Sequence, residues 1–469
     1  SDEGLDEVRR IARARLWMTQ RPGDVSRETL RELMRLDQDA RQGYSNAVAE
    51  TAIGWLQDAS EYNAERGFLW HQYVRSRSTP AARPLWAEIT VALADQDVAE
   101  AGRLLEAHDA RLPRYDRIQA ATMVGDIRLA QTAAFEAQEA QSSDDPLHEQ
   151  LADSLLSFSD QAGVSWGSRH FDGLDESERS AQVSLGFSPR WSARLAWVDI
   201  SRSATQPVTV FGPTSEHALV GALKWQGRSD STELQVAQRE SLATYHPVSL
   251  EHEHRIDARL SARLELGRQL PMQDSLVMRM AGMKDRVGLG LRYQFSRLDA
   301  LALDLGQERY HLQTGAQIGD GRQTTLSYWH TYRQAGPGVD VGTFWSQYDY
   351  SHRTPLSLSG SDLGVLRYFP AGTTDLTAAD LLPRSYRYYG IQLNLNTRFE
   401  QGYTRALRPY ASVSLTRHSE LGAGYGLHLG LARSVLGNDH LSLSWGLGKA
   451  GRETPGLSRE IQLTYRYHF

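Results

Sequence analysis

The last ten residues, EIQLTYRYHF (460–469), alternate between large apolar or aromatic side chains and polar ones. Leu463, Tyr465, Tyr467 and Phe469 share one face of an extended strand, because successive side chains of a strand point to opposite sides. One face suits lipid and the other suits water. A long alternating strand that ends the chain on an aromatic residue is typical of a membrane β-barrel.

The same alternation recurs through the preceding 300 or so residues. It is clear at 183–187, 301–305, 391–395, 427–431 and 441–447, and the alternation around 256–266 predicts one strand over 253–268. About fifteen such strands can be counted, most of them about 9–14 residues long, which suffices to cross a bilayer at a tilt. A soluble β-sandwich also alternates, but the strand length and the aromatic residues near strand ends favour a membrane barrel.

The strand number should be even, because both ends of a bacterial barrel face the same side of the membrane. We therefore expect sixteen strands, with the uncounted crossing within Ser275–Gly282. The sequence predicts a transmembrane antiparallel β-barrel over residues 161–469, wide enough to leave a lumen.

The lengths of the links between these strands predict one barrel end with short turns and another end with a long loop. Links at 297–299, 335–338 and 436–439 are short, as periplasmic turns are. Arg353–Ser385 is long and should be an extracellular loop, which either folds into the lumen as a gate or stands above the barrel. We expect three acidic residues of this loop to line the exit: Asp362, Asp375 and Asp380.

Residues 1–160 follow a helical period instead. Leu85, Ile89 and Leu93 form an apolar stripe that is broken at 95–97, and a second such break follows at 125–126. A spacing of about 30 residues, with alanine where helices would cross, resembles tetratricopeptide repeats. We predict a short α-solenoid, and hence an α + β chain of two domains, 1–160 and 161–469.

The charge of the chain is unevenly distributed. Residues 1–160 hold 28 acidic and 18 basic residues, whereas the remainder holds 29 acidic and 33 basic ones. The acidic first part could attract a cationic partner, or it could be an ordinary solvated helical surface.

Several functional classes find no support in the sequence. The chain has no cysteine, which excludes disulfides and thiolate chemistry. The segment 446–451 matches GxGxxG but lacks a following helix, and 252–254 (HEH) lacks the helical spacing of a metal site. We expect no enzymatic activity, no cofactor and no metal, and the absence of an overall basic charge weighs against nucleic acid.

The polar positions of the predicted strands should face the lumen. Such a wall could hydrogen-bond a hydrated polymer without holding it tightly, as translocation requires, or it could form ion pairs that only stiffen the barrel. The residues expected on this cargo path are Asp257, Glu265, Asp304, Glu308, Gln392, Asn394, Asn396, Gln462 and Arg466. The residues expected to form a barrel-assembly signal are Tyr465, Tyr467 and Phe469.

Helical repeats followed by a sixteen-strand barrel resemble the outer-membrane exporters of bacterial exopolysaccharides, including those of the Pel, poly-N-acetylglucosamine and cellulose systems. The stretches Trp86–Leu105, Leu155–Asp172 and Glu460–Phe469 are most similar to the C-terminal portion of the PelB family. The resemblance spans essentially the whole chain.

The resemblance implies a function and partners. The barrel would lie in the bacterial outer membrane, with the helical part in the periplasm, and would export Pel, a partly deacetylated and hence partly cationic amino-sugar polymer. A ring-forming lipoprotein, PelC, would sit at the periplasmic mouth, and the repeats would recruit the deacetylase PelA. Further repeats and an inner-membrane anchor would precede residue 1.

Three alternatives stay open, and one of them is a structural anchor that conducts nothing. A protein translocator of the surface-lipoprotein assembly modifier type also pairs helical repeats with a barrel, which is expected to have about fourteen strands. A count of sixteen would favour the polysaccharide exporter. The slightly basic barrel part also leaves a neutral or anionic polymer possible as cargo.

Overall fold

The structure is a computed structural model. It describes residues 8–16, 24–41, 45–59, 61–75, 84–171, 173–188, 190–204, 214–227, 229–257, 259–296, 298–333, 337–370, 372–451 and 456–469. The chain divides into two compact units, Ser1–Ser142 and Ser143–Phe469.

The first unit is helical. Its elements are α2 (Asp24–Arg41), α3 (Asn46–Asp58), α4 (Tyr62–Arg75), α5 (Leu85–Ala94), α6 (Val98–His108), η2 (Asp109–Arg111), α7 (Arg114–Val124) and α8 (Ile127–Ala140). Asp97 caps α6 and Asp126 caps α8, each through its side-chain oxygen, and Gly125 ends α7 with a φ of 79°. The helix breaks predicted at 95–97 and 125–126 are therefore present. Small residues, including Ala101, Ala121 and Ala130, are buried where these helices pack.

The second unit begins with α9 (Asp145–Phe158), which leads into the strands. The strands are β1 (Gln161–Phe171), β2 (Leu174–Ser188), β3 (Trp191–Ala204), β4 (Thr214–Gln226), β5 (Asp230–Glu240), β6 (Thr244–Tyr245), β7 (Val248–Arg255), β8 (Leu260–Pro271), β9 (Gly282–Gln294), β10 (Asp299–Leu312), β11 (Gln317–Arg333), β12 (Val339–His352), β13 (Tyr386–Leu395), β14 (Arg408–His418), β15 (Gly422–Arg433), β16 (Asp439–Lys449) and β17 (Leu457–His468). Short helices lie in the links: α10 (Leu276–Ala281), η3 (Gly360–Tyr368), α11 (Ala378–Leu381) and η4 (Thr397–Glu400).

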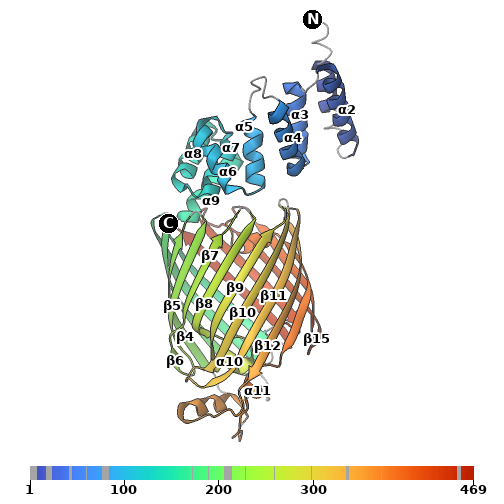
Figure 1. Ribbon diagram of the computed structural model, residues 1–469. Coiled ribbons are helices and arrows are strands. Elements are labelled where there is room, and N and C mark those ends of the chain that lie inside the picture. The colour runs from blue at the N-terminus through green and yellow to red at the C-terminus, as the bar shows by residue number, and fades with distance from the viewer. Residues whose placement is uncertain are drawn as a thin grey trace. The chain divides into compact units, whose positions relative to one another are not determined.

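The strands form a closed antiparallel barrel. Each strand pairs with its neighbours in sequence, and β17 closes the sheet against β1, with Tyr467 opposite Ala162. Because β6 and β7 both pair with β5, they make one crossing, and the seventeen strands of the described sheet amount to sixteen crossings. The predicted fold, a helical region before a sixteen-strand barrel, is confirmed. Figure 1 shows α9 and the C-terminus at one end of the barrel, the α9 end, and α10 and α11 at the other, the α10 end.

The sixteenth crossing is not where it was expected. Ser275–Gly282 contains no strand crossing, because Ser275 caps the short helix α10. The extra crossing arises at 253–268, where the alternation had suggested one strand and the structure has β7 and β8 joined by a turn. The Asp257 carboxylate makes this turn by accepting hydrogen bonds from the backbone N–H groups of Arg259 and Leu260, at 2.7 and 2.8 Å.

The two faces of the barrel wall differ as the alternation predicts. Leu264, Leu305, Leu393, Leu443 and Leu463 are exposed on the outside, where lipid would cover them. The alternate positions face the interior and are mainly polar. None of the described helices is both long enough and apolar enough to cross a membrane.

One inner-face contact depends on a glycine. The Tyr410 ring from β14 lies across Gly430 of β15, and its hydroxyl is 2.7 Å from the Ser442 hydroxyl on β16. A Cβ atom at Gly430 would lie 2.1 Å from the Tyr410 ring, so Tyr410 could not keep this position.

We expect Gly430→Ala to lower the stability of the folded barrel by about 1–3 kcal/mol through overpacking. Gly167→Ala is the matched control, because the nearest atom to a Cβ there is 3.9 Å away. The measurement is the temperature at which the heat-modifiable folded band is lost on a gel. Equal temperatures for the two variants would contradict this account.

A carboxyl group is buried in the helical unit. Glu65 of α4 has no exposed surface; its Oε1 accepts a hydrogen bond of 2.8 Å from the Gln57 amide of α3, and its Oε2 has no partner among the described residues. Burial raises the pKa of Glu65 from 4.5 to about 7, because the charged form loses its hydration.

The raised pKa predicts that the helical unit loses stability as pH rises. Below about pH 4.5 Glu65 is protonated in both the folded and the unfolded chain, and the folded chain releases that proton only near pH 7. The free energy of unfolding should therefore fall by on the order of 2 kcal/mol between pH 5 and pH 8. Thermal melting of the 222-nm circular dichroism signal at the two pH values measures this.

Glu65→Gln should remove most of this pH dependence, since the amide is neutral throughout. Glu28→Gln, at an exposed position of α2, should retain it. Persistence of the full dependence in Glu65→Gln would show that another group is responsible.

Candidate export path

Seven of the residues predicted for the cargo path lie on the inner face of the barrel: Glu265, Asp304, Glu308, Gln392, Asn394, Gln462 and Arg466. Most of them alternate with exposed apolar neighbours such as Leu264, Leu305 or Leu463. Gln392 donates hydrogen bonds to the Asn394 side chain at 2.8 Å and to the Ser412 hydroxyl at 3.2 Å.

The three inward-facing acidic residues already have cationic partners. Arg286 lies 3.0 Å from Glu265 and also pairs with Glu308, which has a second partner in Lys284 at 3.0 Å. Asp304 pairs with Arg263 at 3.0 Å. These pairs join β8, β9 and β10 across their inner face, so the carboxylates brace the wall and present no free negative charge to a cargo.

Two residues predicted for the lumen lie elsewhere. Asp257 is exposed in the β7–β8 turn, where the N–H groups of Arg259 and Leu260 lower its pKa. Asn396 follows β13 with a left-handed φ of 53°; its side chain accepts a hydrogen bond from the Gly338 N–H and donates one to the Pro409 carbonyl. Both side chains close turns at the α9 end, a role that asparagine and aspartate commonly take.

The terminal aromatic residues lie where barrel closure occurs. Tyr465 and Tyr467 pair with Val164 and Ala162 of β1, and the backbone N–H of Phe469 donates to the Asp160 carbonyl at 2.9 Å. Their proposed part in assembly stays a prediction.

A buried ion network occupies the inner face near the α10 end. Arg202 of β3 lies between Glu176 of β2, at 2.7 Å, and Glu216 of β4, at 2.9 Å, and all three side chains are almost fully buried. Arg239 of β5 also pairs with Glu216.

Helix α10 reaches this network through the interior of the barrel. Arg279 lies 3.7 Å from Glu176 and 4.8 Å from the Phe171 ring centroid. In the wall, β2 and β8 are separated by β3, β4, β5 and β6–β7. The contact therefore crosses the lumen, and we call the Arg279 contacts with Phe171 and Glu176 the latch.

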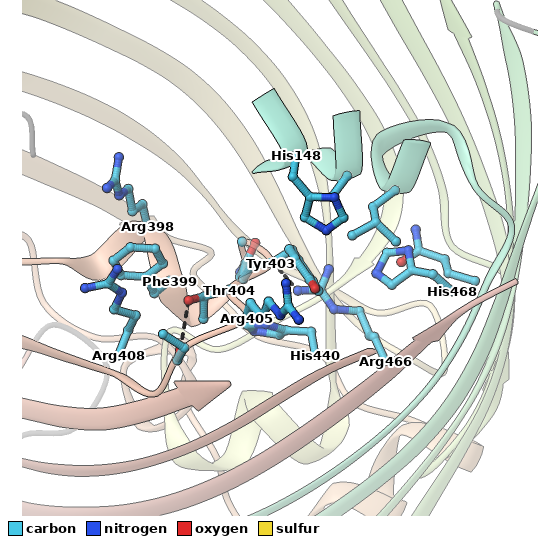
Figure 2. Close-up of a pocket in the computed structure, with 16 residues that line it drawn as sticks. His148, Arg398, Phe399, Tyr403, Thr404, Arg405, Arg408, His440, Arg466 and His468 are labelled. Carbon is cyan, nitrogen blue, oxygen red and sulfur yellow. Dashed lines mark hydrogen bonds between the residues drawn. The ribbon is translucent and has the colours of Figure 1, made fainter. Parts of the chain in front are cut away.

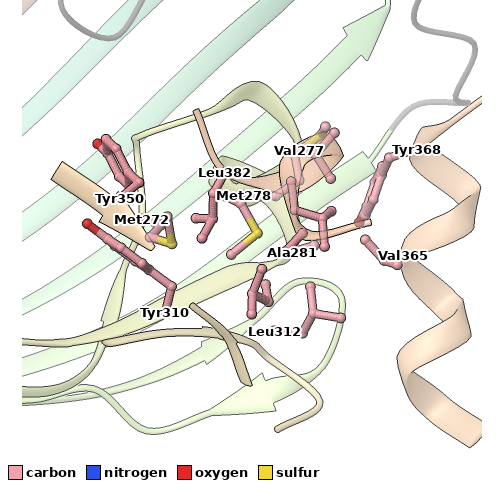
Figure 3. Close-up of a cluster of buried hydrophobic side chains, with 14 of the residues drawn as sticks. Met272, Val277, Met278, Ala281, Tyr310, Leu312, Tyr350, Val365, Tyr368 and Leu382 are labelled. Atoms are coloured by element: carbon pink, nitrogen blue, oxygen red, sulfur yellow. The ribbon is translucent and has the colours of Figure 1, made fainter. Parts of the chain in front are cut away.

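The link 353–385 covers α10, and we call α10 and this link together the lid. Figure 3 shows Met278 and Ala281 of α10 packed with Leu382, Val365 and nearby wall residues such as Leu312, and these side chains are buried. The Ser275 hydroxyl donates to the Leu381 carbonyl at 2.6 Å, which ties the two segments together. The long link thus folds onto the α10 end, and the contacts inside the lid are mainly apolar.

The acidic residues of this link hold its local structure. Asp362 accepts a hydrogen bond from the Thr314 hydroxyl at 2.6 Å and caps η3. Asp380 caps α11 through Thr377, whose hydroxyl and N–H lower the pKa of the Asp380 carboxyl. Asp375 is exposed between these two helices.

Three adjoining cavities lead from the α9 end toward the latch. The first, of 870 Å³, we call the vestibule, and it shares Gln401 and Arg466 with a middle cavity of 370 Å³. The middle cavity shares Glu400 and Gln462 with an inner cavity of 630 Å³, whose walls include Phe171 and Arg279. The path is therefore continuous in its lining residues and ends under the lid.

The cavities differ in chemistry. The middle cavity has Arg194, Glu400 and Arg466 as its charged lining residues, but most of its lining side chains are hydroxyls and amides: Ser165, Ser180, Gln182, Gln401, Ser442, Ser444, Gln462 and Thr464. The vestibule, drawn in Figure 2, lies between α9 and the link 396–407 and is lined by four arginines and three histidines.

Sequence reasoning missed both the latch and the vestibule. Arg279 follows no motif, and its partners lie about 100 residues away in sequence. The vestibule had one signal: the link 396–407 is long for an end whose other links are short, and Arg398, Arg405 and Arg408 lie in or beside it.

Comparison with known proteins places the chain in a family. Residues 156–468, more than half of the chain, match the family described as "PelB, C-terminal beta barrel domain", whereas no curated protein matches. Among solved structures, a "Bacterial polysaccharide outer membrane secretin" is 9% identical with a TM-score of 0.49, over 66% of this chain and 99% of that one. CdiB from Acinetobacter baumannii is 10% identical, with a TM-score of 0.38, over 66% and 60%. OccK3 from Pseudomonas aeruginosa is 12% identical, with a TM-score of 0.36, over 66% and 95%. On the strength of the family match, the chain belongs to the family of PelB C-terminal β-barrel domains.

Proposed function

We propose that this chain forms an outer-membrane pore for the export of a bacterial polysaccharide. The observation that carries the proposal is the middle cavity, where hydroxyl and amide side chains line a path inside a closed barrel. Such groups can both donate hydrogen bonds to sugar hydroxyls and accept hydrogen bonds from them. They carry no charge, so no single site holds the polymer firmly enough to stall it.

The finer proposal follows the family. The cargo would be a Pel-like, partly cationic amino-sugar polymer used in biofilm formation, and the acidic balance of residues 1–160 supports a cationic cargo. The helical unit would lie in the periplasm as tetratricopeptide-like repeats that dock a PelA-like deacetylase. A PelC-like lipoprotein ring would sit at the α9 end. We also propose that the chain catalyses no reaction.

The alternative is a protein translocator of the surface-lipoprotein assembly modifier type. The sixteen crossings favour the polysaccharide exporter over that class, for which about fourteen are expected. The predominance of hydroxyl and amide groups in the middle cavity supports the same choice.

A substitution pair at β16 tests the export path. Ser444 lines the middle cavity, and the adjacent Leu443 is exposed on the outer face. Ser444→Trp should abolish polymer secretion by obstructing the path, whereas Leu443→Trp should leave it unchanged. Polymer in the medium is measured by immunoblot, at matched amounts of heat-modifiable folded barrel. Normal secretion by folded Ser444→Trp would remove this cavity from the path.

The latch predicts how the resting pore stays closed. Arg279→Ala removes a buried ion pair and a cation–π contact, which together should shift the closed-to-open ratio about tenfold toward open. Ion current through planar bilayers containing the purified chain measures the shift.

Arg309→Ala is the control for this experiment, because Arg309 pairs with Asp320 at an exposed position of the wall. If Arg279→Ala conducts no more than wild type or Arg309→Ala, the latch does not keep the pore closed.

A further inference from the structure

Within the part of the chain that the structure describes, the vestibule carries more positive than negative charge. Its sixteen described lining residues include four arginines and three histidines but no aspartate or glutamate. Elsewhere on the inner wall, Arg202, Arg263 and Arg286 are paired with carboxylates. Within the described residues, no ion pair joins any of the four vestibule arginines to a carboxylate: Arg398, Arg405, Arg408 and Arg466.

Two buried nitrogen atoms at the inner side of the vestibule lack partners within the described chain. Arg466 donates to the Gln401 carbonyl through Nη2, but its Nε has no acceptor. His440 donates from Nε2 to the Glu400 carbonyl at 3.1 Å, and its buried Nδ1 has no partner. A buried donor without an acceptor is costly. An anionic oxygen here would satisfy Arg466 and favour a protonated His440.

The outer arginines are held in place by an aromatic ring. The guanidinium carbons of Arg398 and Arg408 lie 4.7 and 5.7 Å from the centroid of Phe399. Stacking on one ring limits the conformations of both side chains, so less entropy is lost when they bind a carboxylate. The open face of the vestibule is thus prepared for anionic groups.

The position of the vestibule indicates whether its anionic ligand is the moving cargo or a partner that stays in place. A dense group of cations would hold an anionic polymer and stall it, and would repel a polymer that carries amines. The middle cavity directly beyond it is lined mainly by hydroxyl and amide groups. A stationary ligand at the mouth avoids both problems, because its carboxylates neutralise the arginines and leave the path free.

We propose that the vestibule is a docking site for an acidic protein segment, one that presents several Asp or Glu carboxylates to Arg398, Arg405, Arg408 and Arg466. This inference rests on the proposed export function, because it requires a partner at the α9 end of a conducting barrel. Docking would also lower the electrostatic barrier that the vestibule sets against a cationic cargo.

Binding of short peptides to the purified full chain in detergent tests the proposal. A fluorescein-labelled hexaglutamate peptide should bind, its affinity should fall as salt rises, and hexaglutamine should not bind. Arg398→Gln combined with Arg405→Gln should weaken hexaglutamate binding at least about tenfold, which corresponds to about 1.4 kcal/mol. Fluorescence anisotropy is the readout, so a failure of export does not affect the result.

The control removes two arginines from other turns at the same end, through Arg190→Gln combined with Arg259→Gln. This variant should bind hexaglutamate as wild type does. Equal weakening in both variants, or no preference for hexaglutamate over hexaglutamine, would overturn the proposal. Tighter binding of a hexameric galacturonate than of hexaglutamate would also overturn it, because the vestibule would then be a site for acidic sugars.

Discussion

Closure of β17 against β1 is the constraint on which the rest of this structure depends. A backbone N–H or carbonyl group without a partner is too costly in hydrocarbon, so a sheet can cross a bilayer only when it has no free edge. The seam consists of ten residue pairs, which join the last strand to the strand that follows α9. With sixteen crossings, closure creates an interior that the wall side chains do not fill. The lid, the ion pairs of the inner face and the export path all lie in this interior.

Charged and uncharged side chains line different parts of the barrel interior. On β8–β10 and around Arg202, acidic and basic side chains neutralise one another and tie neighbouring strands together. Along β1, β2, β16 and β17, the inner face of the middle cavity carries hydroxyl and amide groups. Rigid, paired walls on one side and a neutral lining on the other suit a pore that must keep its width while a hydrated polymer slides past. The vestibule is the exception: no described carboxylate pairs with its arginines, and our proposal assigns that role to a partner that remains in place.

Alternation in the sequence could predict much of this fold, because it records which face each strand residue occupies. The alternation failed to predict the turn between β7 and β8 within 253–268. The Asp257 side chain forms this turn, and no glycine-rich segment in the sequence marks it. The alternation assigned the correct face to Glu265, Asp304 and Glu308 but could not show their partners. Partners depend on register between strands, and the latch depends on a contact across the lumen. Neither is encoded in the local period that sequence analysis reads.

The central claim, that this barrel exports a polysaccharide, is tested most directly by locating the polymer in a strain that lacks the gene. The account predicts that polymer disappears from the medium, accumulates inside the cell envelope, and returns to the medium when the full chain is restored. Normal polymer secretion in that strain, together with the loss of a protein from the cell surface, would contradict the account and identify the barrel as a protein translocator.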